Sequence, residues 1–213
     1  MIQPQKRLFR PLFTTGIFSV LWIAAVAGGL QTLMSYESSP GTVGNVRPAW
    51  PIKSKISPPT NRPVLIMLAH PRCPCTQASV GELAKIMAQV QGKVSAYVLL
   101  LKPGTTPSGW EDTGLRWAAA KIPGVTVVSD VDGIEARKFG AETSGHTVLY
   151  DRHGSLLFSG GITGSRGHSG DNAGENAIVS LVNDHHSLLA KTFVFGCSLV
   201  DKVREGKYAQ CSN

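Results

Sequence analysis

Residues 64–101 read "VLIMLAHPRCPCTQASVGELAKIMAQVQGKVSAYVLLL", and this stretch decides the fold. The run 64–69 is continuously apolar and has the length of a strand, as is typical of a strand covered on both faces. Residues 76–90 carry apolar side chains at three-and-four spacing, which predicts a helix with one buried stripe. A second apolar run, 94–101, completes a strand–helix–strand unit, for which we expect a right-handed crossover and parallel strands. The chain is therefore predicted to be an α/β protein.

The segments after residue 101 alternate between helical and strand patterns. We expect a helix at 111–120, a strand at 125–130, a short helix at 132–140, a hairpin at 146–161 and a final helix at 173–189. Gly140 is predicted to end the short helix, because glycine adopts the left-handed conformation that closes many helices. Residues 152–154 are predicted to form the hairpin turn.

The first 36 residues have the pattern of a membrane anchor. A basic cluster of Lys6, Arg7 and Arg10 precedes an uncharged segment, 11–36, which is about long enough to cross a bilayer as a helix. The positive charge places the N-terminus in the cytoplasm and the rest of the chain outside it. The alternative is a cleaved signal peptide, because Ala25-Val26-Ala27 resembles a signal-peptidase site. We favour a retained single-pass anchor in the inner (plasma) membrane, and both interpretations export the domain.

Composition divides the remainder into three parts. Residues 37–62 are rich in proline, serine and glycine and show no periodicity, so we expect a semi-extended linker. Residues 63–190 carry the alternating helices and strands and form one globular domain. Residues 191–213 form a C-terminal tail whose structure the sequence does not assign.

The net charge of +7 does not indicate a nucleic-acid partner. Three of these charges come from the N-terminal basic cluster, which leaves +4 over the rest of the chain. No dense basic stripe interleaved with aromatic residues is present, as a nucleic-acid surface would require. We therefore expect no nucleic-acid partner.

Cys73 and Cys75 are the strongest chemical signal. They lie where a strand meets a helix, and backbone N–H groups and the helix dipole at such a junction stabilise a thiolate. Arg72 adds a positive charge, and His70 lies close by in sequence. A disulfide across Pro74 alone would depart from relaxed geometry and would be easy to reduce. Redox chemistry is favoured in an exported chain, with a metal site or two packed, inert cysteines as alternatives.

The order of these elements resembles the thioredoxin fold, a central mixed sheet with helices on both faces. The chain is similar to membrane-tethered, exported thioredoxin-like proteins, and especially to the RedB-like group. The motifs that carry this resemblance are "HPRCPCT" (70–76), "TSGHTVLYD" (143–151), "GGITGSRGHSGDNAG" (160–174) and "VFGCSL" (194–199). The resemblance implies thiol–disulfide exchange outside the cytoplasm, without a cofactor.

Two positions depart from the superfamily pattern. The usual active site is Cys-X-X-Cys, but here Arg72 occupies the place of the usual nucleophile and Cys73 lies one residue closer to Cys75. The superfamily also has a cis-proline before the hairpin strand, where this chain has His146. His146 is therefore a candidate tuning residue.

The glycine-rich loop at 160–172 lacks the Gly-Lys-Ser/Thr of a Walker phosphate loop, which excludes that function. In a thioredoxin fold this loop would lie near the cysteine helix. Arg166 and His168 are therefore expected to cover the cysteines and to tune or gate them. The alternative is a flexible connector capped by Asp171 or Asn172.

Copper is the alternative ligand. Soft thiolates suit Cu(I), and His70, His146 or His168 would complete a site; the set we assign to this alternative is Cys73, Cys75 and His168. No histidine has a diagnostic spacing to the cysteines, so no metal is assigned in the preferred interpretation.

Two more cysteines lie in the tail, Cys197 and Cys211. In an exported protein they are expected to form a structural disulfide. The alternative is that Cys197 folds back as a resolving thiol for Cys73 or Cys75.

The preferred interpretation is a thiol–disulfide oxidoreductase with Cys73 as the attacking thiolate and Cys75 as the resolving thiol. Its partners would be a protein thiol or disulfide substrate, or a membrane redox partner. A copper-binding chaperone or sensor and an inactive thioredoxin-fold binding module are the other two hypotheses.

Overall fold

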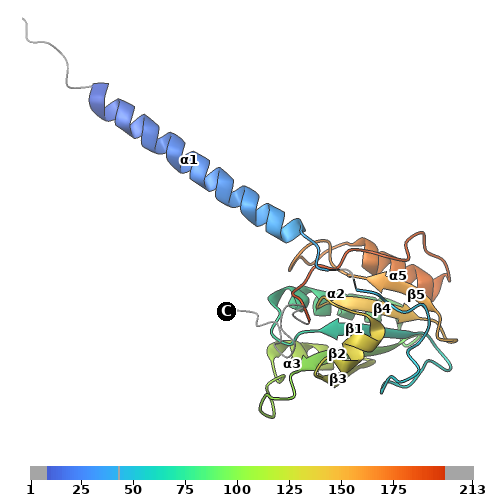
Figure 1. Ribbon diagram of the computed structural model, residues 1–213. Helices are drawn as coiled ribbons and strands as arrows, with labels where there is room; N and C mark the ends of the chain where they lie inside the picture. The colour runs from blue at the N-terminus through green and yellow to red at the C-terminus, as the bar shows by residue number, and fades with distance from the viewer. Residues whose placement is uncertain (1–8, 43, 200–213) are drawn as a thin grey trace, which may run out of the picture. The chain divides into compact units, whose positions relative to one another are not determined.

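The computed structural model describes residues 9–42 and 44–199 and separates an N-terminal helix from a folded domain that starts at Ser39. Helix α1 (Phe9–Ser38) is 30 residues long (Figure 1). Its segment Thr14–Ser38 has a mean hydropathy of 1.8 and buries none of its apolar window within the protein. It is long and apolar enough to cross a membrane, and an N-terminal signal sequence shares these properties.

The domain is built on one five-stranded sheet with the order β3-β2-β1-β4-β5. Strand β1 lies at its centre, parallel to β2 and antiparallel to β4. Strand β3 continues the parallel half, and β5 pairs antiparallel with β4. The strands are β1 (Val64–Ala69), β2 (Ser95–Lys102), β3 (Val125–Val131), β4 (His146–Tyr150) and β5 (Leu156–Gly160).

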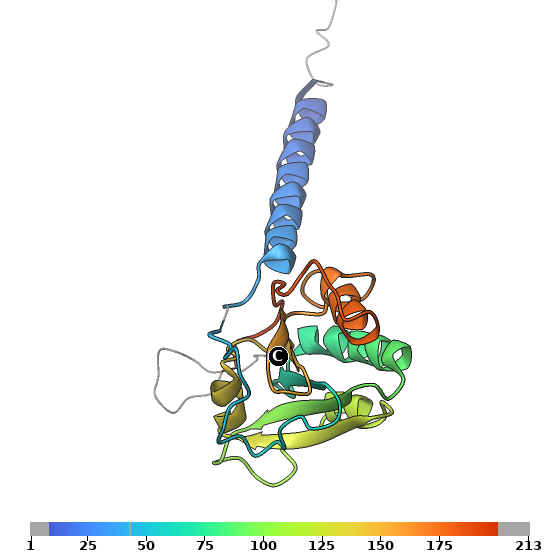
Figure 2. The same cartoon turned by 90° about the vertical axis from the view of Figure 1, so that its right-hand side faces the viewer.

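Helices cover both faces of this sheet, as the two views in Figures 1 and 2 show. Alternate residues of β1 point to opposite faces. Leu65 and Met67 pack among the residues of three helices on one face, whereas Ile66 and Leu68 pack with the fourth helix on the other. The first three are α2 (Pro74–Val90), α3 (Gly114–Ala120) and α5 (Ala173–Asn183), and the fourth is α4 (Ile134–Phe139). The predicted thioredoxin-like architecture is confirmed.

Helix ends follow local sequence rules, with one difference. Gly140 ends α4 at φ 74°, as predicted. Helix α5 ends at Asn183 and not at residue 189. His185 takes a φ of 59°, which a continuing helix does not allow, and the Leu188 side chain beyond it is 91% exposed. The apolar residues at 188 and 189 therefore do not extend the buried stripe of the helix.

The predicted linker packs on the domain, and the Gly41 N–H donates to the Val194 carbonyl at 2.8 Å. The Trp50 ring meets Phe139 and Tyr150 edge-on, with 5.2 Å between ring centroids in each pair. The Trp50 N–H donates to the Gly154 carbonyl at 2.8 Å, and Ile56 is buried with the same apolar cluster. Proline excludes regular structure here, but it does not stop an extended segment from burying its large apolar side chains.

The tail also packs on the sheet. Residues 190–193 run alongside β5, where the Ser159 N–H donates to the Ala190 carbonyl at 3.0 Å and the Thr192 N–H donates to Ser159 at 3.3 Å. The chain then reaches the segment before β4, where the Ser144 N–H donates to the Cys197 carbonyl at 2.8 Å. Cys211 lies outside the described residues, so its predicted disulfide with Cys197 is not tested.

Replacing Trp50 by alanine is expected to lower the free energy of unfolding by about 2 kcal/mol, because a half-buried aromatic ring loses its packing. Chemical denaturation of the full chain in detergent measures the change. Ile52→Ala is the matched control, since the Ile52 side chain is fully exposed, and it should change stability by less than about 0.5 kcal/mol. If Trp50→Ala lowered the free energy of unfolding by as little as Ile52→Ala, the packing of the linker would not stabilise the domain.

Candidate functional site

Cys73 is the N-cap residue of α2, in an extended conformation with φ −82° and ψ 114°. A short turn after β1 brings it there, and the Cys73 N–H donates to the His70 carbonyl at 3.1 Å. Pro74 follows in the first turn of the helix, where its missing N–H costs nothing. The side chain is only 2% exposed. The sequence therefore fixes this thiol at the positive end of α2.

Hydrogen bonds lower the pKa of Cys73 from 9.0 to about 4. The largest cause is the side chain of Cys197, whose Sγ lies 2.8 Å from the Cys73 Sγ. Burial acts in the opposite direction, while the hydroxyl and backbone of Thr76 and the backbone of Cys197 stabilise the thiolate further. Cys73 is accordingly a thiolate at neutral pH, which is the nucleophilic form of cysteine.

Cys75 is buried two residues further along, in the first turn of the helix, and its pKa is raised. Burial is the largest cause, and the negative charge of Cys73 adds to it. Arg166 acts in the opposite direction, by its charge and by a side-chain hydrogen bond. Cys75 is therefore a protonated thiol at neutral pH beside the thiolate of Cys73.

Arg166 reaches this cluster from the glycine-rich loop. Its Nη1 donates to the Gly196 carbonyl at 2.6 Å and its Nε donates to the Ser39 carbonyl at 3.1 Å. With its effect on Cys75, the side chain thus connects the cysteine helix to the tail. The loop brings Arg166 to the cysteines, as its expected tuning role requires.

Arg72 and His70 both contact the ring of Trp110. The Arg72 guanidinium lies over the Trp110 ring, 4.8 Å from its centroid, and its side chain is exposed. The His70 ring meets the same Trp110 edge-on at 5.7 Å, and its Nδ1 accepts from the Arg72 N–H at 3.1 Å. Trp110 comes from the loop after β2, where no sequence pattern indicated it.

The other two candidate histidines, His146 and His168, do not join the cysteines in a cluster. His146 is buried, its Nε2 lies 2.9 Å from Ser159 Oγ, and burial lowers its pKa to about 4. His146 is therefore neutral and faces β5. His168 lies on the exposed part of the loop. Among residues 9–42 and 44–199, no group of three or more His, Cys, Asp or Glu side chains is placed to hold a metal ion, and the set Cys73, Cys75 and His168 does not come together.

Two hydroxyls complete the site, and the sequence did not indicate them. Thr76 Oγ1 lies 2.6 Å from Ser144 Oγ, and Ser144 Oγ accepts from the His70 N–H at 2.8 Å. Because the Thr76 hydroxyl donates to the Cys73 sulfur, the Ser144 hydroxyl donates to Thr76 in turn. A buried chain of donors thus ends on Cys73. The position of Thr76 in the first turn of the helix is the only sequence signal for this chain of donors, because Ser144 lies far away in the sequence.

Comparison with known proteins supports the fold alone. No family model and no curated protein matches the chain. Similar solved structures include an uncharacterized conserved protein from Geobacillus kaustophilus, with 16% identity and a TM-score of 0.57 over 79% of this chain and 97% of that one. A hypothetical protein from Sinorhizobium meliloti 1021 has 17% identity and a TM-score of 0.55 over 76% and 96%. A secreted Mycobacterium tuberculosis disulfide oxidoreductase has 14% identity and a TM-score of 0.41 over 59% and 83%.

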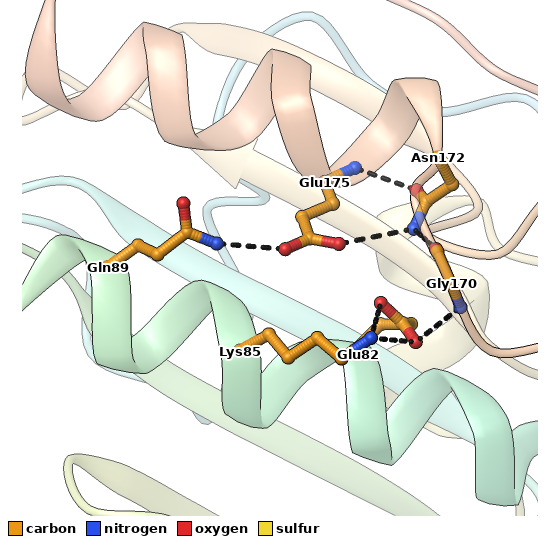
Figure 3. Close-up of polar contacts among 6 residues, drawn as sticks. All are labelled: Glu82, Lys85, Gln89, Gly170, Asn172 and Glu175. Carbon is orange, nitrogen blue, oxygen red and sulfur yellow. Dashed lines mark hydrogen bonds and ion pairs between the residues drawn. The ribbon is translucent and has the colours of Figure 1, made fainter.

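A pair of buried carboxyl groups, Glu82 and Glu175, joins the glycine-rich loop and α5 to the cysteine helix (Figure 3). Glu82 on α2 accepts from Lys85 Nζ at 3.0 Å and from the Gly170 N–H at 3.0 Å. Glu175 on α5 accepts from Gln89 Nε2 at 2.8 Å. Burial raises the pKa of Glu175, and its hydrogen bond with Glu82 raises it further. Glu175 therefore keeps its proton above the usual carboxyl range.

The raised pKa of Glu175 gives the domain a pH-dependent stability. Because the pKa of Glu175 is higher in the folded chain, its contribution is complete below the ordinary glutamate pKa of about 4.3 and is lost as pH rises through the folded value. Glu175→Gln stays neutral, so its free energy of unfolding should fall less as pH rises from about 4.3 to neutrality. Denaturation at a series of pH values measures this slope. Asp184→Asn is the control, because Asp184 is an exposed carboxylate just beyond the other end of α5, and it should keep the parent slope. Equal slopes for Glu175→Gln and the parent chain would contradict the raised pKa of Glu175.

Proposed function

We propose that this chain is a membrane-anchored thiol–disulfide oxidoreductase of the RedB-like kind that works outside the cytoplasm. The observation that carries the proposal is the thiolate of Cys73, which is stabilised at the start of α2 by Cys197 and Thr76. A thiolate with a lowered pKa in contact with a second thiol is the arrangement that disulfide exchange needs. The thioredoxin-like fold agrees with this chemistry but does not carry it.

The exchange begins when the Cys73 thiolate attacks one sulfur of a substrate disulfide. The new bond is a mixed disulfide, and the other substrate sulfur leaves as a thiolate and takes a proton from water. A second thiol of the chain then attacks Cys73 and releases the reduced substrate. Cys75, the resolving thiol assigned from the sequence, contacts Cys73 and is one of two thiols next to it. The same steps in reverse oxidise a substrate dithiol.

Substrates of this chemistry are protein thiols or disulfides, or a membrane redox partner. The extracytoplasmic location rests on the basic cluster before α1 and on the apolar segment Thr14–Ser38. An oxidising compartment is where disulfide chemistry operates. No cofactor is required, because the sulfurs carry the electrons.

Cys73→Ser is expected to reduce exchange to the uncatalysed background, because serine cannot form the mixed disulfide. Reduction of insulin by dithiothreitol, with the full chain in detergent, measures the rate. In the parent chain Cys73 should also alkylate faster than Cys75 at about pH 5, where an ordinary thiol is protonated. Exchange that survives in Cys73→Ser would refute the proposal. Stoichiometric Cu(I) binding by a chain without exchange would instead favour a copper-binding protein.

The location has its own test. Alkaline phosphatase fused after Asn213 should be active in a bacterial host, because the enzyme needs the oxidising periplasm to form its disulfides. Replacing Lys6, Arg7 and Arg10 together by glutamine should reduce this activity, since the charge difference that orients α1 is lost. An inactive fusion that is nevertheless expressed would place the domain in the cytoplasm and contradict the export.

A further inference from the structure

We propose that Cys197 in the tail, and not Cys75, is the thiol that forms the intramolecular disulfide with Cys73, an inference that rests on the proposed exchange function. The two sulfurs lie 2.8 Å apart. A disulfide bond is about 2.05 Å long, so less than about 1 Å of movement would close it. The other described cysteine, Cys75, follows Cys73 by two residues, with Pro74 between them.

Backbone pairing holds Cys197 in a fixed register. The Ser144 N–H donates to the Cys197 carbonyl at 2.8 Å, and the Leu199 N–H donates to the Glu142 carbonyl at 2.8 Å. Between them, Ser198 forms an antiparallel bridge with Thr143. The tail therefore lies as a short added strand against the segment that precedes β4. Its thiol is presented by β-type pairing and not by a flexible end.

Side-chain packing fixes both sides of this added strand. The Leu199 side chain is 1% exposed and packs in the apolar cluster with α4. At Gly196 a Cβ atom would lie only 1.9 Å from the Ser144 carbonyl oxygen, so no larger residue allows this close approach. Arg166 donates to the Gly196 carbonyl at 2.6 Å. Cys197 thus lies between an anchored leucine and a backbone contact that requires glycine.

Cys75 is poorly suited to the same role. Cys73 is the N-cap of α2, and Pro74 stiffens the short connection between it and Cys75. Its raised pKa keeps Cys75 protonated, and Arg166 interacts with the same thiol. A disulfide with Cys73 would also have to close across a single residue, whereas Cys197 approaches from a separate strand.

The electrons balance through these two sulfurs. After Cys73 has attacked a substrate disulfide, the Cys197 thiol loses its proton to water and attacks the Cys73 sulfur. The mixed disulfide breaks, the substrate leaves as a thiolate and is protonated, and a Cys73–Cys197 disulfide remains. Two electrons have passed to the substrate. A dithiol reductant returns them by the reverse steps, and the oxidised state ties the tail covalently to α2.

Peptide mapping distinguishes the possible pairs. Trypsin cleaves after Arg72, Lys85, Lys191, Lys202 and Lys207, so Cys73 and Cys75 share peptide 73–85, Cys197 lies in 192–202 and Cys211 lies in 208–213.

The reduced full chain in detergent is mixed with insulin, quenched in acid, alkylated and digested without reductant. Peptides 73–85 and 192–202 should be linked in the parent chain and in Cys75→Ser. In Cys197→Ser this link should be lost, and the mixed disulfide of peptide 73–85 with insulin should accumulate.

Two alanine variants test the docking of the tail while every thiol is kept. Gly196→Ala should slow resolution and accumulate the mixed disulfide, because the added methyl displaces Cys197 from Ser144. Gly164→Ala is the matched control in the neighbouring loop, where a Cβ has open space, and it should resolve like the parent chain. Cys211→Ser should likewise keep the link between peptides 73–85 and 192–202.

Three results would overturn the inference while leaving the exchange function intact: a disulfide within peptide 73–85, a link of 192–202 to 208–213, or a mixed disulfide that accumulates in Cys75→Ser alone. Failure of the exchange function itself looks different. In that case insulin stays oxidised with every variant, but oxidised glutathione still links 73–85 to 192–202 in the parent chain, and the pair is then a structural bridge.

Discussion

The contact between the start of α2 and the tail is the interaction on which the site depends. A thiolate buried to 2% exposure is unfavourable unless donors replace the water it loses, and here Cys197 and Thr76 provide them. One donor comes from the first turn of the helix itself and the other from a residue more than a hundred positions later in the chain. The lowered pKa of Cys73 therefore depends in large part on the docked tail. Removing the tail would leave a buried sulfur with its burial penalty and fewer donors.

The sequence predicted the fold well because the fold is encoded by local periodicity. Residues 64–69 read as a strand covered on both faces, and the structure buries all six of them. Gly140 ended a helix as expected, because left-handed backbone is a property of a single residue. The final helix was predicted too long, because apolar residues at 188 and 189 have the correct spacing but no surface to pack against. Periodicity indicates which residues are able to be buried, and the rest of the chain decides whether they are.

The candidate site was only half predictable for the same reason. Cys73, Cys75 and Arg72 form one local motif, and their place at the helix start follows from it. Thr76 and Ser144 meet through a contact between segments 68 residues apart, and Cys197 meets Cys73 across 124 residues. No spacing rule reports such contacts. The proline-rich linker shows the same limit, since a composition typical of a free spacer also fits an extended segment that docks Trp50 on the sheet.

Arg166 explains why the glycine-rich loop belongs to this site. Its guanidinium donates to the tail at Gly196 and acts on the Cys75 thiol, while Gly170 in the same loop donates to the buried Glu82. The loop is thus fixed to α2 at one point and reaches the tail at another. A change in the position of the tail would change the surroundings of both cysteines: Cys73 would lose a donor, and Arg166 would lose the carbonyl that holds it near Cys75. Because the tail completes a contact that acts on each sulfur, the pKa of Cys73 and the docking of residues 196–199 are coupled.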